Sequence, residues 1–254
     1  MQSPKLTLII AYTYNNDENR FIALTQLMKD IQNQTYRNFE IIVVEDTQGK
    51  ESVFPYKDKV DKIISITDPQ NRKFNKSWVM NVGARDATTE HLLFIDAEMS
   101  FGTDYLQKIV DFIPDKVFFN GWVRYWCEVG RDNPRRRIHY FDDTLHAMVG
   151  CFYSTKDFFF NKLGGYCEDF FGYGGEDNEI YIRAKFILNK IPALQYTIIH
   201  QYHHWHPESS HDPLNPSRHA ILTRTDLSPK DVINKLVNSK IGNKWEPTLT
   251  KARW

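Results

Sequence analysis

The sequence contains few cysteines, no surplus of either charge and no long apolar run. Its three cysteines, Cys127, Cys151 and Cys167, lack the spacing of a metal-binding pair, and their odd number predicts reduced thiols in a cytoplasmic protein. Lysine plus arginine and aspartate plus glutamate both number 32, so the net charge gives no global attraction to nucleic acid or to an anionic membrane. The first apolar run, Leu6–Ala11, is too short to cross a bilayer, and we expect neither a signal peptide nor a transmembrane segment.

Two common nucleotide-binding signatures are also missing. No G-x-G-x-x-G follows the first predicted strand, and G-x-x-x-x-G-K-S/T occurs nowhere in the chain. These absences argue against a dinucleotide-binding Rossmann enzyme and against a P-loop NTPase. Hydrophobic residues nevertheless make up 41% of the 254 positions, which is enough for a sizeable core without disulfides.

Short apolar runs alternate with helix-like periodicity in the first half of the chain. This alternation predicts an α/β fold in which a doubly wound, mostly parallel sheet is flanked by helices. Buried strands are predicted at Leu6–Ala11, Phe39–Val44, Lys62–Ile66 and Glu90–Ile95, and helices over the face from Phe21 to Ile31, over Lys76–Ala87 and over Tyr105–Ile113.

The alternation weakens after residue 116. Val117–Val129 is aromatic and strand-like, Phe152–Leu163 is helical or mixed, and Tyr196–Ile199 is predicted to be a late strand. A final helix is predicted to begin at Ser228-Pro229, because serine is a good N-cap and proline is favoured at the first helical position. Gly242 is expected to end that helix.

Polar clusters follow three of the predicted strands, at Tyr12–Asn16, Glu45-Asp46 and Asp96–Glu98. In sheets of this kind, ligands bind beyond the carboxyl ends of the strands. Asp96 and Glu98 are two residues apart, so continued strand geometry would point both carboxylates the same way, which suits Mg²⁺ or Mn²⁺ carrying a substrate diphosphate. Acidic pairs after strands are equally common as solvated loops, and the spacing alone does not decide between the two.

Four histidines, His200, His203, His204 and His206, lie within seven residues directly after the predicted late strand. Imidazole is the commonest side-chain metal ligand. Because the four are clustered, we expect at least one of them to bind a metal.

The stretch Gly172–Glu179 places a glycine-rich turn directly before a helical pattern. Apolar residues from Ile180 to Ile191 recur at helix spacing, so Glu176 and Asp177 stand at the positive end of a helix. Acidic residues are common caps in that position, which is the more frequent role for such residues in isolation. The glycines also let the backbone approach a ligand and move, which makes a carboxylate here a candidate general base.

Four motifs in the chain resemble those of a known family. Leu8–Asn15 together with Glu40–Asp46 resembles the opening of GT-A fold, family-2-type glycosyltransferases. Phe74–Gly83 is similar to the F-N-R-A-x-x-x-N-V-G segment of β-1,4-galactosyltransferases and chondroitin-polymerase-type transferases. Asp96–Glu98 occupies the place of the family's D-x-D motif, and Phe171–Glu179 resembles W-G-W-G-G-E-D-D-D. Each motif is weak alone, but the four occur in the family's order.

The resemblance implies a fold and an activity. It implies one GT-A domain over residues 1–227, with a nucleotide-binding half to about 115 and an acceptor-binding half from about 116, and a C-terminal helix and tail at 228–254. The implied reaction is inverting, metal-dependent transfer of a sugar from a nucleotide-diphospho-sugar, expected to be a UDP-sugar, to a hydroxyl of a glycan acceptor. Mn²⁺ or Mg²⁺ would be the cofactor.

The resemblance also implies catalytic roles. Asp177 would be the base that takes the proton of the acceptor hydroxyl, and Glu176 would bind the donor sugar or the acceptor. Glutamate replaces the second aspartate of D-x-D, and its longer side chain changes the geometry of any metal site. The implied metal ligands are Asp96, Glu98 and His206, with His203 as the alternative to His206.

For the donor, the resemblance implies that Asp46 contacts the base or ribose, that Phe74 packs on uracil and that Lys76 stands near the base or phosphates. Tyr173 would replace the tryptophan of the family's mobile loop, which excludes water when it closes. The changes at Tyr173 and Lys76 leave the donor sugar open. The donor-binding residues implied are Ala11, Tyr12, Thr13, Asn15, Asp46, Phe74, Lys76, Asp96, Tyr173 and Gly175.

Two alternative functions follow from the same sequence. The same chemistry on a hydroxymethylated DNA base or on a protein, as in phage-type modification enzymes, would use the basic loop Arg131–Arg137. The zero net charge makes a nucleic-acid partner the less favoured of the acceptors. A non-catalytic sugar-nucleotide binding protein is the second alternative, and the presence of every acidic motif position argues against it.

Overall fold

A six-stranded sheet forms the centre of the computed structural model, which describes residues 3–14, 17–120, 122–125, 150–172, 174–189, 200–204 and 227–250. The neighbouring strands β3, β2, β1 and β4 are parallel, whereas β8 runs antiparallel to both β4 and β6. The predicted α/β fold with a mostly parallel sheet is therefore confirmed. In spatial order the strands are β3 (Lys62–Ile66), β2 (Phe39–Asp46), β1 (Leu6–Thr13), β4 (His91–Asp96), β8 (Phe152–Thr155) and β6 (Phe118–Asn120).

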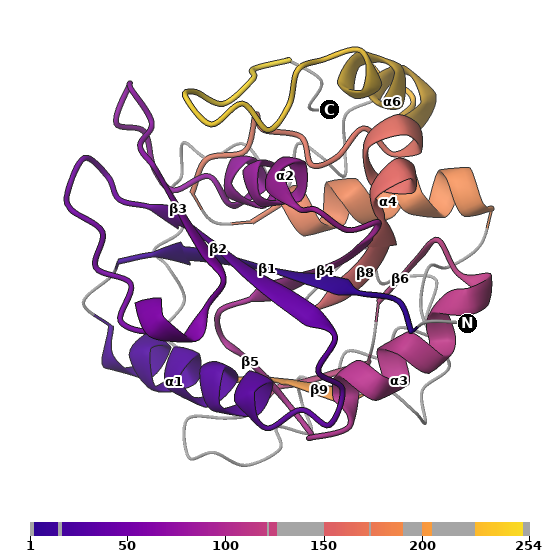
Figure 1. Ribbon diagram of the computed structural model, residues 1–254. Coiled ribbons are helices and arrows are strands. Elements are labelled where there is room, and N and C mark those ends of the chain that lie inside the picture. The colour runs from indigo at the N-terminus through magenta and orange to yellow at the C-terminus, as the bar shows by residue number, and fades with distance from the viewer. Residues whose placement is uncertain are drawn as a thin grey trace.

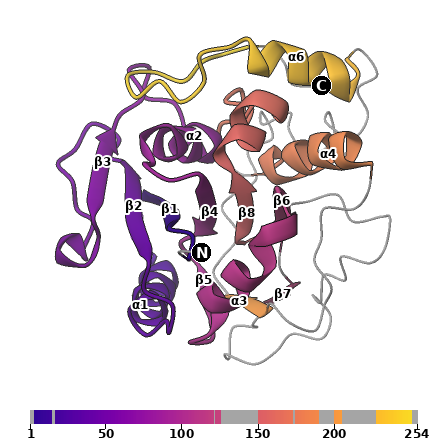
Figure 2. The same cartoon turned by 45° about the vertical axis from the view of Figure 1, so that its right-hand side comes forward.

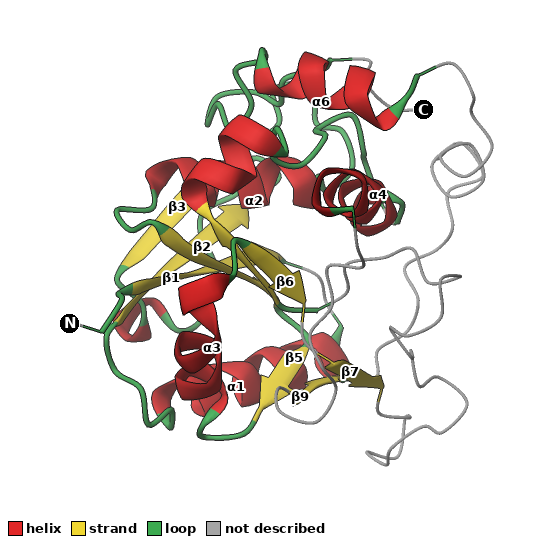
Figure 3. Cartoon of the chain, turned by 90° about the vertical axis from the view of Figure 1, so that its right-hand side faces the viewer, coloured by secondary structure: helices red, strands yellow, loops and turns green. Residues whose placement is uncertain are grey.

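Helices cover both faces of this sheet (Figures 1 and 3). Alternate residues of β1 enter different cores: Ile9 packs with the α2, α4 and α6 side, and Leu8 and Ile10 pack with the α1 and α3 side. This is why the strand is a continuous apolar run rather than an alternating one. The helices are α1 (Glu18–Gln32), α2 (Lys76–Asp86), α3 (Tyr105–Phe112), α4 (Glu176–Leu188) and α6 (Pro229–Val237), with short turns η1 (Lys57–Lys59), η2 (Ile113–Asp115) and η4 (Phe158–Lys162).

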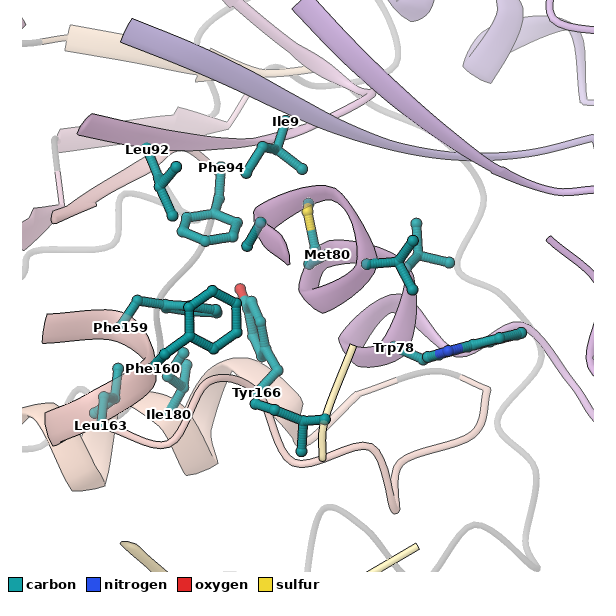
Figure 4. Packing of buried hydrophobic residues seen from close by; sticks show 14 of the residues in the cluster. Ile9, Trp78, Met80, Leu92, Phe94, Phe159, Phe160, Leu163, Tyr166 and Ile180 are labelled. Carbon is teal, nitrogen blue, oxygen red and sulfur yellow. The ribbon is translucent and has the colours of Figure 1, made fainter. Parts of the chain in front are cut away.

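The core between the sheet and α2 is rich in aromatic rings (Figure 4). Phe94 stacks on Phe152, with ring centroids 4.5 Å apart, and packs in a tilted arrangement against Phe159, with centroids 4.6 Å apart. At Gly83, α2 lies so close to β1 that an added Cβ would stand 2.5 Å from Ile9 Cγ2. Burying each large apolar side chain contributes roughly 1.5–3 kcal/mol, so this layer fixes where α2 begins and thus where Lys76 stands.

The C-terminal helix packs on this same core through Val232 and Leu236. Its start has the predicted form, because Ser228 and Asp231 make a reciprocal capping box before Pro229. The prediction that Gly242 ends the helix is wrong, since α6 ends at Val237. Gly242, with φ +75°, instead forms a later turn that presents its backbone N–H to Glu168 Oε1 at 2.6 Å.

Several other boundaries also differ from the sequence patterns. The first two strands run on through Thr13 and Asp46, which pair with each other, so these polar positions are part of the sheet. Phe152–Leu163 is mixed, with β8 followed by the π-helical turn η4. A second, three-stranded sheet was not predicted; its order is β5 (Met99–Phe101), β9 (His200–His203) and β7 (Trp122–Tyr125). The predicted strand at 196–199 lies outside the described residues.

Candidate active site

The polar clusters predicted at the strand ends lie along one edge of the sheet. The register pairs Thr13 of β1 with Asp46 of β2, and Ala11 of β1 with Asp96 of β4. The carboxyl ends of these three parallel strands are therefore neighbours, which is where ligands bind in sheets of this kind.

The loop before α4 is attached to the start of α2 by hydrogen bonds. Asn75 caps α2 by accepting from Trp78 N at 2.9 Å, and its Nδ2 donates to the carbonyl of Glu168 at 2.7 Å. Gly172 N donates to the carbonyl of Phe74 at 2.8 Å. These contacts bring the first turn of α4 toward the first turn of α2 (Figure 2 shows both helices on one face of the sheet).

Gly175 is the N-cap residue of α4, with φ +99°. That left-handed conformation is costly for other residues, and it directs the chain into the helix without a side-chain cap. Glu179, one turn further on, is fully buried in an ion pair with Arg183 at 2.5 Å. Glu179 is thus a structural acid within the motif, while Glu176 and Asp177 face a different partner.

That partner is Lys76, the first residue of α2. Its Nζ lies 2.8 Å from Asp96 Oδ1, 3.1 Å from Asp177 Oδ1 and 3.8 Å from Glu176 Oε1. The Lys76 side chain is only 16% exposed, so solvent screens these charges weakly. We call these four residues the lysine–carboxylate cluster; it joins the end of β4 to the starts of α2 and α4.

Burial and charge act against each other in this cluster. Burial alone would lower the pKa of the Lys76 ammonium, but Asp177 and Asp96 raise it well above its usual value. Burial raises the pKa of Asp177 well above its ordinary value; Lys76 opposes this, and Glu176 and Asp96 add to it. Burial likewise raises the pKa of Glu176 against the effect of Lys76. A carboxylate whose pKa is raised in this way is a better proton acceptor than an exposed one.

The two acids of the D-x-D-like segment contact different cations. Asp96 is bound to Lys76, and its Oδ2 also accepts from Gly150 N at 3.2 Å. Glu98 forms a short ion pair with Arg20 of α1. Glu98 lies beside the histidine strand, since its carbonyl accepts from His204 N at 2.9 Å.

Two of the four histidines, His200 and His203, are the first and last residues of β9, so they lie within a strand rather than after one. Nδ1 of His203 is hydrogen-bonded to the carbonyl of His204 at 2.8 Å. Within the described ranges, no three histidine, cysteine or acidic side chains are grouped so that they could hold a metal ion. The predicted residues His206, Asn15 and Tyr173 and the basic loop Arg131–Arg137 lie outside the described residues.

The other end of the site surrounds Asp46. Burial of the Asp46 carboxyl raises its pKa, and the nearby charge of Asp68 raises it further. The backbone N–H of Gln48, which donates to Asp46 Oδ1 at 3.1 Å, lowers the pKa in part. Asp68 holds Arg72 through two hydrogen bonds of 2.6 and 2.9 Å, and the Arg72 guanidinium lies 4.4 Å from the centre of the Phe171 ring.

The sequence patterns did not single out Asp68 or Arg72. The available signal was a fourth polar cluster, because β3 ends at Ile66 beside Asp46 and a polar loop follows it. Two further residues of the predicted donor site pack against apolar side chains. Tyr12 lies edge-on to Phe54, with ring centroids 5.2 Å apart, and Phe74 is half-buried against the core.

The model of the family described as Glycosyl transferase family 2 matches residues 8–179, and the chain belongs to that family. No curated protein sequence matches the chain significantly.

Solved structures show the same fold at low sequence identity. The S. aureus TarS 1–349 structure in complex with UDP-GlcNAc is 17% identical, with a TM-score of 0.59, and the match covers 81% of this chain and 60% of TarS 1–349. GalNAc-T7 with UDP, GalNAc and Mn²⁺ is 15% identical, with a TM-score of 0.55, over 81% of this chain and 44% of that one. The chain thus spans about 60% of the TarS fragment it matches. No helix in the described ranges has the length and apolar character needed to cross a membrane.

Proposed function

We propose that this protein is an inverting glycosyltransferase that moves a sugar from a UDP-sugar to a hydroxyl of a glycan acceptor. The observation that carries the proposal is the lysine–carboxylate cluster, which joins Asp96 at a strand end to Asp177 at the start of α4 through one ammonium. TarS, which has the same fold, was solved with UDP-GlcNAc and with UDP.

In the proposed reaction, Asp177 accepts the proton of the acceptor hydroxyl while the hydroxyl oxygen attacks the anomeric carbon. The bond from that carbon to the diphosphate oxygen breaks, and the nucleoside diphosphate leaves with its electron pair. One displacement with one base inverts the anomeric carbon. Glu176, beside Asp177 and within 3.8 Å of Lys76, would orient the donor sugar or the acceptor.

We place the nucleotide along the edge that runs from Asp46 to Asp96. Asp46 would accept hydrogen bonds from the base or ribose, and Phe74 would pack against the base. Lys76 stands between this edge and Asp177, where its ammonium would meet the diphosphate. Ala11, Tyr12 and Thr13 at the end of β1 would form the floor of the donor site.

A divalent cation fits the charge of the site. Three carboxylates face one ammonium, so full ionisation leaves a net charge of two negative units, which would repel a diphosphate. Oε2 of Glu176 is buried and accepts no hydrogen bond from any described residue. Carboxylate oxygens suit Mn²⁺ or Mg²⁺, and GalNAc-T7 was solved with Mn²⁺. Asp96 and Glu98 would hold the metal, with His206 or His203, and the metal would supply positive charge to the leaving diphosphate.

A screen of sugar nucleotides tests the proposal. The purified protein is incubated with Mn²⁺ and each UDP-sugar in turn, with and without glycan acceptors, and UDP release is measured alongside the melting temperature. We expect one donor to raise the melting temperature and to release UDP, and we expect Asp177→Asn to release far less. Stabilisation without any turnover would favour a non-catalytic binding protein, and the absence of both effects for every donor would contradict the proposed function.

A further inference from the structure

Lys76 contacts two carboxylates that have separate roles in the proposed reaction. Its Nζ is 2.8 Å from Asp96, the proposed metal ligand, and 3.1 Å from Asp177, the proposed base. The two acids come from different elements, and Lys76 is the one cation within 4.0 Å of both among the described residues. An ammonium in this position holds the pair together and also occupies the space between them.

We propose that Lys76 is an internal counter-ion that competes with a divalent cation for Asp96 in the donor-free protein, and that it moves onto the diphosphate when the donor binds. This inference rests on the proposed function, because it assigns a device to the proposed donor site. Lys76 is a positioning residue in this account, since it sets which cation the carboxylates contact.

The competition follows from the distances. A metal ion bound to a carboxylate oxygen lies roughly 2.1 Å from it, and Asp96 Oδ1 already has the Lys76 ammonium at 2.8 Å. Two cations on one oxygen repel each other strongly where the side chains are mostly shielded from water. The second oxygen, Oδ2, accepts from Gly150 N at 3.2 Å, and a divalent cation on either oxygen would lie close to the ammonium. A divalent cation therefore binds Asp96 more tightly when the ammonium withdraws.

Lys76 is able to withdraw, because a lysine ammonium sits on a flexible four-carbon chain. The diphosphate offers it a negative charge of similar strength to the one it leaves. Glu98, the other acid of the proposed metal pair, is held in the same way by Arg20. Protein cations thus engage both acids in the donor-free protein, and metal and nucleotide are expected to strengthen each other's binding.

The test is a calorimetric titration of the donor-free protein with Mn²⁺. Lys76→Gln is expected to bind Mn²⁺ about tenfold or more tightly than the wild type, within the usual range for coupled sites. Lys76→Arg keeps the charge and is expected to bind Mn²⁺ as weakly as the wild type. Lys62→Gln is the matched control, because it removes a cation that pairs with Asp86 at 2.6 Å at the opposite end of α2, and it should change nothing. Equal or weaker Mn²⁺ binding by Lys76→Gln would overturn the proposal.

A second pair of variants covers the case in which Lys76→Gln does not fold. Lys76→Gln with Asp177→Asn removes one charge of each sign, which is better tolerated than leaving a buried charge without its partner. This double variant is expected to bind Mn²⁺ more tightly than Asp177→Asn alone, and equal affinities would contradict the competition. Adding UDP should raise the Mn²⁺ affinity of the wild type more than that of Lys76→Gln. Failure of the proposed function would instead appear as an absence of UDP binding and turnover in the wild type.

Discussion

At the amino ends of the parallel strands, one carboxylate has several donors, whereas at their carboxyl ends three carboxylates share one ammonium. Glu40 of β2 accepts from Lys5 Nζ and Thr7 Oγ1, both at 2.7 Å, and from Thr88 N at 3.1 Å. Burial alone would raise the pKa of Glu40, but these hydrogen bonds lower it to about 2. At the other end, burial raises the pKa of Asp177 well above its ordinary value despite the contact with Lys76.

The difference indicates which edge is built for stability and which for chemistry. The Glu40 carboxylate receives all of these hydrogen bonds from within the protein, so its ionised form stabilises the fold. The lysine–carboxylate cluster buries three carboxyl groups around a single ammonium, an arrangement that costs stability and is found at functional sites. The comparison predicts that substitutions at the two edges change different properties.

The largest effect is expected at the carboxyl edge. Replacing both Asp96 and Glu98 by Ala should weaken Mn²⁺-dependent binding of UDP by about 100-fold or more, because the proposed metal contributes several kcal/mol to holding the diphosphate. Calorimetry with UDP, with and without Mn²⁺, measures this. Glu40→Ala is the control from the opposite edge and should bind UDP like the wild type; a similar loss in both variants would remove the distinction.

A buried carboxylate elsewhere in the fold shows whether donors or burial decide the pKa. Glu168 accepts from Gly242 N and Thr248 N, both at 2.6 Å, yet burial raises its pKa from 4.5 to about 7. The neutral Glu168 carboxyl contributes fully to stability below pH 4.5, and this contribution is lost as the pH rises through 7. The unfolding free energy should therefore fall by about 2–3 kcal/mol over that range because of Glu168. Urea unfolding of Glu168→Gln should have a flatter pH dependence between pH 4.5 and 8, and an unchanged slope would contradict this assignment.

The smallest effect is expected at the amino edge. Because folding lowers the pKa of Glu40 from 4.5 to about 2, its stabilisation is complete above pH 4.5 and is lost as the pH falls through 2. With screening by solvent, Glu40→Gln should cost about 1–2 kcal/mol at pH 7, and the difference from the wild type should shrink at pH 3. Urea unfolding at both pH values measures it. A cost that is the same at pH 3 and pH 7 would mean that the charge of Glu40 plays no part.

The central strands of the sheet were predictable because they are buried on both faces and read as continuous apolar runs, as at residues 41–44. That the acids at the strand ends lie along one edge was also predictable. The alternation of strands and helices predicts parallel strands, and the carboxyl ends of parallel neighbours meet at the same edge. Short elements were not predictable: β5 has three residues and exists because it pairs with β9, about a hundred positions away. The end of α6 was not predictable from Gly242 either, because a glycine indicates a turn but not whether the turn directly follows a helix.

The contacts within the site could be inferred from the sequence only in part. The pattern placed Asp177 at the start of a helix, and the family resemblance placed Lys76 near the base or phosphates. Neither indicated that the two side chains meet, because the contact joins residues 101 positions apart and depends on the Asn75 and Gly172 hydrogen bonds. Glu179 resembles its acidic neighbours in sequence, and only the buried pair with Arg183 separates it from them.

The most direct test of the account compares turnover and nucleotide affinity in Asp177→Asn. The substitution keeps the size of the side chain and removes the proton acceptor. Sugar transfer is expected to fall by about 10²–10⁴-fold, as for loss of a general base, while UDP affinity stays within a few-fold of the wild type. Undiminished transfer in this variant would contradict the assignment of Asp177 as the base.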